Sequence, residues 1–122
     1  MSFAILTNSV GLAKQYPVEA TRASGLALTG GTVSHLTFAT RSQYLNIQNK
    51  ATSASTLGVY IHYGQGTYVA LTCDAAVGDD YIAPGEQLSM PAGVDWVSVL
   101  SPNGALTVNG PADNNLVCYA LN

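Results

Sequence analysis

The sequence carries very little charge. Its 122 residues include four Lys or Arg and seven Asp or Glu, so charged residues make up 9% of the chain, whereas a soluble domain typically has about 25%. The hydrophobic fraction of 48% is ordinary. Intrinsically disordered chains combine low hydrophobicity with high net charge, and helical bundles carry many Glu, Lys and Arg residues on their outer faces. The composition therefore excludes both classes.

The scarcity of cationic side chains argues against a nucleic acid partner. Proteins bind nucleic acids mainly through Lys and Arg residues that neutralise phosphates, and this chain has only Lys14, Arg22, Arg41 and Lys50, widely spaced. All four precede residue 51, whereas most acidic residues follow residue 73, and the net charge is −3. We expect no direct contact with nucleic acid. A modest basic patch that meets an acidic partner stays open.

Long apolar runs are also missing. Residues 3–6 form a four-residue apolar run without a cationic flank, which is shorter than the roughly 7–15 residues of a signal-peptide core. No segment approaches the about 20 apolar residues of a membrane span. We therefore expect a protein that is made in the cytoplasm and does not bind membranes. Cys73 and Cys118 fit that compartment as buried thiols, and a disulfide between them is the less favoured alternative.

Neutral polar and turn-forming residues take the place of the missing charge. Ser, Thr, Asn and Gln contribute 34 residues, with 12 Gly and 5 Pro. Hydrophobic residues recur with a period of two, which predicts strands. We expect short strands at residues 25–28, 33–38, 44–49, 56–63, 68–73, 81–82, 87–90, 94–100, 105–108 and 116–121. Residues 64–66 would join two of them in a hairpin, and residues 9–16 are compatible with a single helical turn.

Short strands at this spacing predict a single all-β domain over residues 1–122. We expect an antiparallel β-sandwich of jelly-roll or Greek-key type, with residues 1–18 as an irregular N-terminal arm. The arm would either cross its own sandwich or reach a neighbouring subunit. The residues expected to face the core are Leu45, Ile47, Val59, Ile61, Leu71, Trp96 or its neighbours Val97 and Val99, and Leu116 or Val117.

No pattern of catalytic or metal-binding residues is present in the sequence. The two histidines, His35 and His62, lie in no nucleophile motif, and with the two cysteines they lack the spacing of a zinc site. The acidic loop 74–80 does not match an EF-hand, so we expect a solvated turn there, with a calcium site as the open alternative. We therefore predict a protein that is not an enzyme and has no cofactor.

Several features predict instead a subunit that packs against other proteins. The chain has seven Tyr and one Trp against two Phe, and amphipathic rings of this kind are typical of interfaces and of sugar platforms. The strands at 57–63, 68–73 and 116–121 contain no charged residue that would protect an exposed edge. Tyr60, His62 and Tyr68 would share one sheet face. The candidate interface residues are Phe3, Ile5, Leu6, Tyr16, Tyr60, His62 and Tyr68.

Four segments also carry a resemblance to a known group of proteins: YLNIQN at 44–49, GVYIHYG at 58–64, IAPGEQL at 82–88 and WVSV at 96–99. They resemble the small β-sandwich structural proteins of tailed bacteriophages, among them the jelly-roll cement or decoration proteins of the capsid. The resemblance implies a virion subunit, assembled in the host cytoplasm, that binds the outer surface of the major capsid protein lattice as a homodimer or homotrimer. There it would reinforce the head against the pressure of packaged DNA. The acidic net charge agrees with an outer position.

A binding module is the alternative. In that interpretation the chain is a phage tail or fibre domain, or a lectin-like sandwich, that binds a carbohydrate or receptor through Tyr60, Tyr68 and Trp96.

Overall fold

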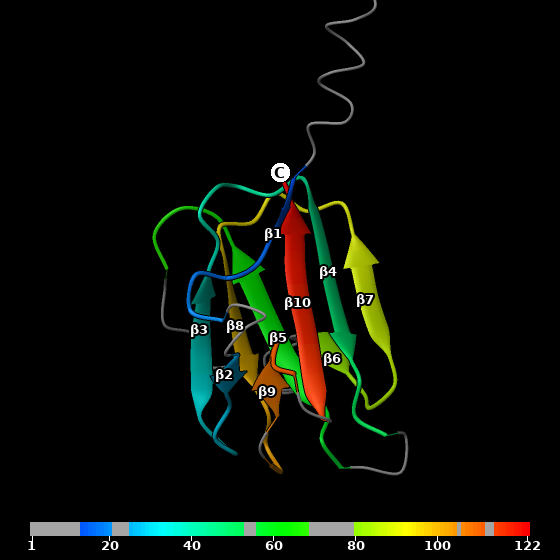
Figure 1. Ribbon diagram of the computed structural model, residues 1–122. Helices are drawn as coiled ribbons and strands as arrows, with labels where there is room; N and C mark the ends of the chain where they lie inside the picture. Colours follow the sequence, from blue (N-terminus) through cyan, green and yellow to red (C-terminus); the bar gives the residue numbers. More distant parts are fainter. Residues whose placement is uncertain (1–12, 21–24, 53–55, 69–79, 105, 112–113) are drawn as a thin grey trace, which may run out of the picture.

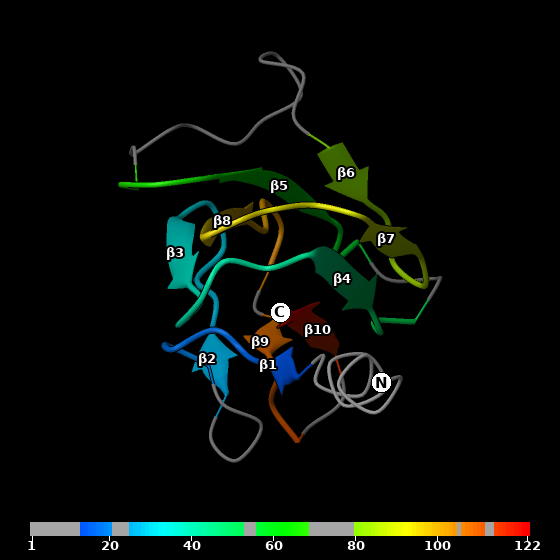
Figure 2. The same cartoon turned by 90° about the horizontal axis from the view of Figure 1, so that it is seen from above.

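The chain folds into two β-sheets that pack face to face (Figures 1 and 2). The structure, a computed structural model, describes residues 13–20, 25–52, 56–68, 80–104, 106–111 and 114–122. These residues form ten short strands and no helix. The described part of the chain therefore has no helix that could cross a membrane. The predicted all-β sandwich is confirmed.

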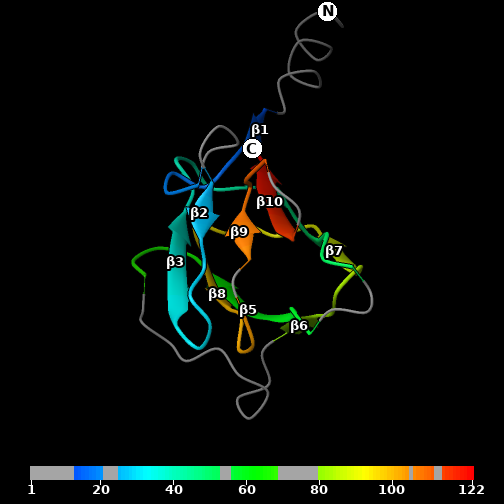
Figure 3. The same cartoon turned by 60° about the horizontal axis from the view of Figure 1, so that its bottom comes forward.

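One sheet has six strands and the other four. The six-stranded sheet has the order β2 (Leu26–Ala27), β9 (Thr107–Val108), β10 (Asn115–Leu121), β4 (Tyr44–Asn49) and β7 (Gln87–Met90), with β1 (Lys14–Gln15) paired to the far end of β10. The four-stranded sheet has the order β3 (Val33–Thr37), β8 (Trp96–Leu100), β5 (Val59–Gly64) and β6 (Asp80–Ile82). Figure 3 shows β2 and β9 in one layer and β8, β5 and β6 in the other.

Alternate residues of the strands fill the space between the two sheets. Four residues expected in the core are at most 1% exposed: Leu45, Ile47, Val59 and Ile61. Where the sequence left alternatives, the residues that join the core are Val97 and Val99 of β8 and Leu116 of β10, and not Trp96 or Val117. Leu71 lies outside the described residues.

One neighbouring pair, β9 and β10, runs parallel, whereas the sequence predicted an antiparallel sandwich. Asn109 follows β9 and Asn114 precedes β10, and both have left-handed backbone, with φ of 56° and 55°. Asn adopts this conformation more readily than most residues because its short polar side chain can bond locally. Asn115 then closes the turn through two hydrogen bonds with the Gly110 backbone, at 3.0 and 2.7 Å.

The second strand of the hairpin predicted around residues 64–66 lies outside the described residues, apart from Tyr68. Of the described strands, β8 pairs with one side of β5 over residues 60–64, and β6 pairs with the other side over residues 59–61. A strand at residues 68–73 that paired along the whole of β5 would meet β6 at residues 59–61.

The described end of the N-terminal arm crosses its own sandwich. Lys14 and Gln15 form β1, which pairs with the end of β10, so the helical turn expected near these residues is wrong there. The Gln15 side chain donates to the Thr40 carbonyl oxygen (2.8 Å) and accepts from the Thr40 N–H (3.2 Å). The end of β10 offers unpaired backbone groups that a strand can satisfy and a helix cannot. Residues 1–12 lie outside the described residues.

The sequence predicted three strands without a charged residue to protect an exposed edge. Two of these three are interior strands. β5 lies between β8 and β6, and β10 lies between β4 on one side and β9 and β1 on the other. An interior strand needs no charged residue to prevent aggregation, because its backbone groups are already paired. Their lack of charge therefore follows from their place in the sheets.

Candidate interface: an aromatic face and an open edge

The outer face of the four-stranded sheet gathers aromatic side chains. Val59 and Ile61 of β5 face the core, so Tyr60 and His62, which alternate with them, point outward. The strand registers place His35 of β3, Trp96 of β8 and Tyr81 of β6 on the same face. Tyr60 and His62 thus share a face, as the sequence predicted.

Tyr68 also lies on this face, as predicted, although it belongs to no strand. Its ring stacks on His35 with centroids 3.4 Å apart and planes at 17°, and meets Trp96 edge-on at 5.1 Å. The Ser98 hydroxyl donates to the Tyr68 hydroxyl oxygen at 3.1 Å. The ring centroids of His62 and Trp96 lie 5.7 Å apart. We call these four residues, His35, His62, Tyr68 and Trp96, the aromatic cluster.

Trp96, the single tryptophan, lies at the centre of this cluster. It pairs with Gly64 of the neighbouring strand, and a Cβ atom on Gly64 would come within 2.5 Å of the indole Cζ2 atom. Only glycine leaves room for the ring there. Trp96 is 5% exposed, and its Nε1 atom has no hydrogen-bond partner in the described structure. The sequence predicted Gly64 only as a turn residue and gave no sign of this close packing.

An ion pair holds the turn that leads to Tyr68. Arg41 donates from Nε and Nη2 to the two carboxylate oxygens of Asp95, at 3.1 and 3.0 Å, and the Gly66 N–H donates to Asp95 Oδ2 at 2.5 Å. The hydrogen bonds from Arg41, and to a smaller extent the one from Gly66, hold the pKa of Asp95 below its usual range. The same pair raises the pKa of Arg41. The turn is therefore tied to the start of β8 at Asp95.

The exposed part of the face is formed by two tyrosines. The rings of Tyr60 and Tyr81 lie 4.8 Å apart at an angle of 50°, and Tyr81 is 49% exposed. None of the outward-facing residues of the four strands is Lys, Arg, Asp or Glu; they are Val33, His35, Thr37, Trp96, Ser98, Leu100, Tyr60, His62, Gly64 and Tyr81. We call this side of the four-stranded sheet the neutral face; Ser98 and Trp96 are buried within it.

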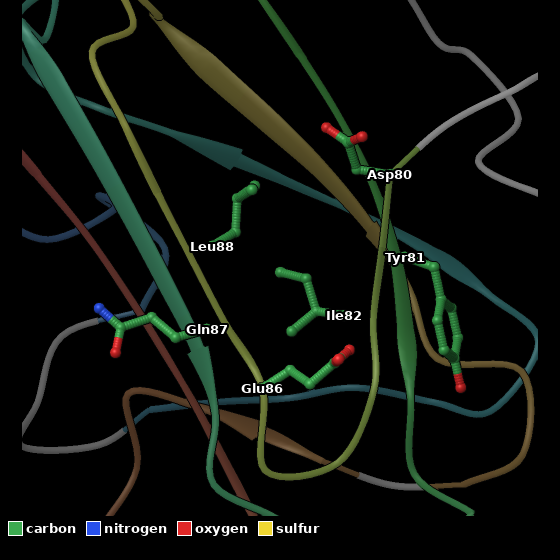
Figure 4. Close-up of a pocket in the computed structure, with 6 residues that line it drawn as sticks. All are labelled: Asp80, Tyr81, Ile82, Glu86, Gln87 and Leu88. Carbon is green, nitrogen blue, oxygen red and sulfur yellow. The ribbon is translucent and has the colours of Figure 1, made fainter.

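A groove of about 280 Å³ opens between β6 and β7, which are edge strands of different sheets. The side chains of Ile82 and Leu88 point into it, whereas Tyr81 points away (Figure 4). Asp80 and Glu86 contribute a carboxylate each to its rim. The groove thus combines two apolar side chains with polar and acidic groups at its border.

A tight turn at Pro84 and Gly85 sets the distance between β6 and β7. Gly85 has a φ of 84°, as the third residue of a type II turn requires, and the Glu86 N–H donates to the Ala83 carbonyl oxygen at 3.0 Å. The Glu86 carboxylate accepts from the Ala83 N–H at 2.9 Å. The turn predicted at Pro84 is therefore present, but it joins strands of two different sheets.

The described residues contain no catalytic or metal-binding arrangement. No group of three or more His, Cys, Asp and Glu side chains comes together among them. Cys118 is free and buried in β10, and burial raises its pKa to about 12, so it is a poor nucleophile. Cys73 and most of the acidic loop 74–80 lie outside the described residues. The absence of enzymatic activity stays a prediction.

The structure brings together only some of the predicted interface residues. Tyr60, His62 and Tyr68 meet on the neutral face. Tyr16 lies on the six-stranded sheet, with its ring 6.3 Å from that of Tyr119 in an edge-on contact. Phe3, Ile5 and Leu6 lie outside the described residues.

Comparisons with known proteins identify no relative. No family model matches the chain, and no curated protein and no solved structure is significantly similar to it.

Proposed function

We propose that this protein is a non-enzymatic subunit of a larger assembly and binds its partner through the neutral face. The most specific form of the proposal is a capsid cement or decoration protein that binds the outer surface of the major capsid protein lattice of a bacteriophage. One observation carries it: the outward residues of four adjacent strands include no Lys, Arg, Asp or Glu and present the half-exposed Tyr81 beside Tyr60. Interface cores are depleted in charge and enriched in tyrosine.

The mechanism would be burial of neutral surface, repeated by symmetry. Tyr81 offers a large ring at low cost in side-chain entropy and would act as an anchor in a pocket of the partner. Individual contacts of this size are modest, but many identical copies on a lattice, linked to one another, bind through their summed contacts. The net charge of −3 suits a surface that faces away from packaged DNA.

The direct test is the composition of purified virions. We expect the chain in the particle at a fixed copy number relative to the major capsid protein, measured by quantitative mass spectrometry. Its absence from virions would refute the specific proposal.

A pair of variants tests the face. Tyr81→Lys places a charge on the neutral face and should abolish attachment to capsids that lack the protein. Tyr44→Lys is the matched control, because Tyr44 is 37% exposed but lies on the other sheet. Tryptophan fluorescence shows whether each variant is folded. If both variants attach equally well, the neutral face is not the binding surface.

Removal of the start of the N-terminal arm provides a second test. Phe3, Ile5 and Leu6 were predicted to contact a neighbour, so a chain without residues 1–6 should attach to capsids less tightly while its unfolding midpoint stays unchanged. Unchanged occupancy and thermal protection would show that the arm has no part in attachment.

Carbohydrate binding is the second candidate, and the Tyr60–Tyr81 ring pair, with Tyr81 49% exposed, favours it. A glycan array with hits that the Tyr81→Ala variant loses would support a lectin-like module. An array without hits, together with the chain in virions, would support the cement protein.

A further inference from the structure

β7 is an edge strand whose outer side has no neighbour in the described structure. It pairs with β4 alone, at Leu45–Met90, Asn46–Ser89, Ile47–Leu88 and Gln48–Gln87. The flanking hydrogen bonds, from the Asn49 N–H to the Glu86 oxygen and from the Ala92 N–H to the Gln43 oxygen, show which residues face β4.

Alternation fixes the direction of the remaining backbone groups. In an antiparallel ladder every second residue bonds to the partner strand and the residues between them point away. Glu86, Leu88 and Met90 therefore bond to β4, and the N–H and C=O groups of Gln87 and Ser89 point out of the sheet. Both residues are exposed. Four backbone hydrogen-bonding groups are thus presented along one edge.

Among the described residues, each of the other sheet edges is protected over at least part of its length, and β7 is not. At the edge of β3, the Thr37 carbonyl oxygen accepts from the Val18 N–H at 2.6 Å, and the Thr37 N–H donates to the Glu19 carboxylate at 2.7 Å. β6 carries Asp80, and β2 is two residues long. β7 has the sequence Gln-Leu-Ser-Met and contains neither a charge nor a proline, the devices that usually prevent edge pairing.

We propose that β7 pairs with β7 of a second copy of this chain, so that two six-stranded sheets form one continuous sheet across a two-fold axis. The register centred on Leu88 places Gln87 opposite the partner subunit's Ser89, and Ser89 opposite the partner subunit's Gln87. All four outward groups of each strand are then used, in four hydrogen bonds.

Neighbouring registers fit less well. A shift towards the C-terminus would place Pro91, which has no N–H, opposite Gln87, and a shift towards the N-terminus would place Gly85 of the turn opposite Ser89. The pairing is self-complementary and uses the same edge in both copies, so it closes as a dimer and does not extend into a fibre.

Side chains on both faces of the sheet suit the pairing. Leu88 is half-buried and lines the groove, and in this register it faces the partner subunit's Leu88 in a close, non-hydrogen-bonded pair. On the outer face Ser89 already accepts from Asn46 Nδ2 at 3.2 Å and bonds the Tyr44 hydroxyl at 2.8 Å. The new neighbours on this face are neutral as well.

The first test is the oligomeric state of the full chain. Because the contact is small, the dimer should dissociate on dilution, and sedimentation velocity over a hundredfold range of concentration should show this. Ser89→Pro removes an outward N–H that β4 does not use, so two of the four bonds between subunits are lost. We expect its dimer dissociation constant to rise roughly tenfold or more. Ser89→Ala is the control for the lost hydroxyl and should still dimerise.

A cross-link tests the register. Opposed residues in a non-hydrogen-bonded pair have Cα atoms about 4.5 Å apart, so Leu88→Cys should form a disulfide between two copies under mild oxidation. Ser89→Cys, displaced along the strand from its symmetry mate, should not. The wild-type chain controls for its own two cysteines. The cross-link remains decisive if Ser89→Pro fails to fold.

Two results would overturn the inference: a wild-type chain that is monomeric throughout, or a folded Ser89→Pro dimer together with no Leu88→Cys cross-link. This dimer rests on the proposed function, because it names a second copy of the chain as one partner in the proposed assembly. The two fail separately, because a chain bound to capsids as a monomer would refute only the dimer, and a β7 dimer absent from virions would refute only the capsid role.

Discussion

The buried amide of Asn109 offers a quantitative test of what holds the sandwich together. Its side chain is fully buried. Nδ2 donates to the carbonyl oxygens of Ala20 and Cys118, at 3.1 and 2.8 Å, and Oδ1 accepts from the Cys118 N–H at 2.8 Å. Three backbone groups from two distant segments therefore depend on one amide. Asn109→Ala would leave all three buried without a partner.

The expected cost follows from these contacts. A buried polar group left without a partner costs about 1–3 kcal/mol, and the left-handed backbone at Asn109, with a φ of 56°, is less favourable for alanine than for asparagine. Partial entry of water reduces the sum, so we expect a loss of about 3–5 kcal/mol. A domain of this length has a free energy of unfolding of roughly 6–18 kcal/mol. The substitution would remove a large part of it.

Urea denaturation followed by Trp96 fluorescence measures the effect, because the single tryptophan is buried in the native state. With a slope of about 1–3 kcal/mol per molar urea, the midpoint should fall by about 1–5 M. Asn109→Gly removes the amide but allows the left-handed backbone, so it should be less destabilised than Asn109→Ala by about 1 kcal/mol. A midpoint for Asn109→Ala within about 0.3 M of the wild type would refute the reasoning.

Three further predictions concern single groups. The folded pKa of Asp95 is depressed by Arg41, so its stabilisation is complete above the unfolded pKa of about 3.9 and is lost as the pH falls through the folded pKa. Urea midpoints should show the advantage of wild type over Asp95→Asn shrinking with acidification, and an advantage unchanged at pH 2 would contradict this. Burial raises the pKa of Cys118 to about 12, so a thiol reagent at pH 8 should label it only in urea, as measured by peptide mapping; rapid labelling of the native protein would show that the thiol is accessible. Gly64→Ala should displace Trp96, shift its fluorescence to the red and destabilise the fold by about 1–3 kcal/mol, whereas an unchanged spectrum would mean that the ring does not depend on this glycine.

The local pattern of the sequence predicted the strands but not their neighbours. The alternation around Ile47 and Ile61, and the Pro84 turn, define segments that the structure places where they were expected. Pairing depends on contacts between distant segments, which no local pattern contains. The tight turn at residues 64–66 favoured a hairpin with the next segment of the chain, whereas the described partner on that side of β5 is β6, which pairs with residues 59–61. The parallel β9–β10 pair depends on two left-handed asparagines whose backbone conformation the sequence did not specify.

In the candidate interface, too, local pattern predicted some residues and contacts between distant segments determined the others. Strand parity alone was enough to place Tyr60 and His62 on one face. It could not assign Trp96, because the residues of β8 are almost all buried and both parities appear apolar. His35 was missed as well, since its contact with Tyr68 joins segments 33 residues apart in the sequence. The usable signal was the glycine at position 64, which makes room for a ring once the register of β5 and β8 is known.

Once the strand order is known, the low charge of the chain indicates a partner only at sheet edges and exposed faces. β5 and β10 lack charge because they are interior, so they say nothing about a partner. The informative places are those where a monomer would normally carry charge. Glu19 covers the Thr37 end of β3 and β6 carries Asp80, so two of the few acids of the chain lie at sheet edges. Residues 87–90 of β7 and the neutral face have no such residue, so among the described residues these two surfaces remain available for contact.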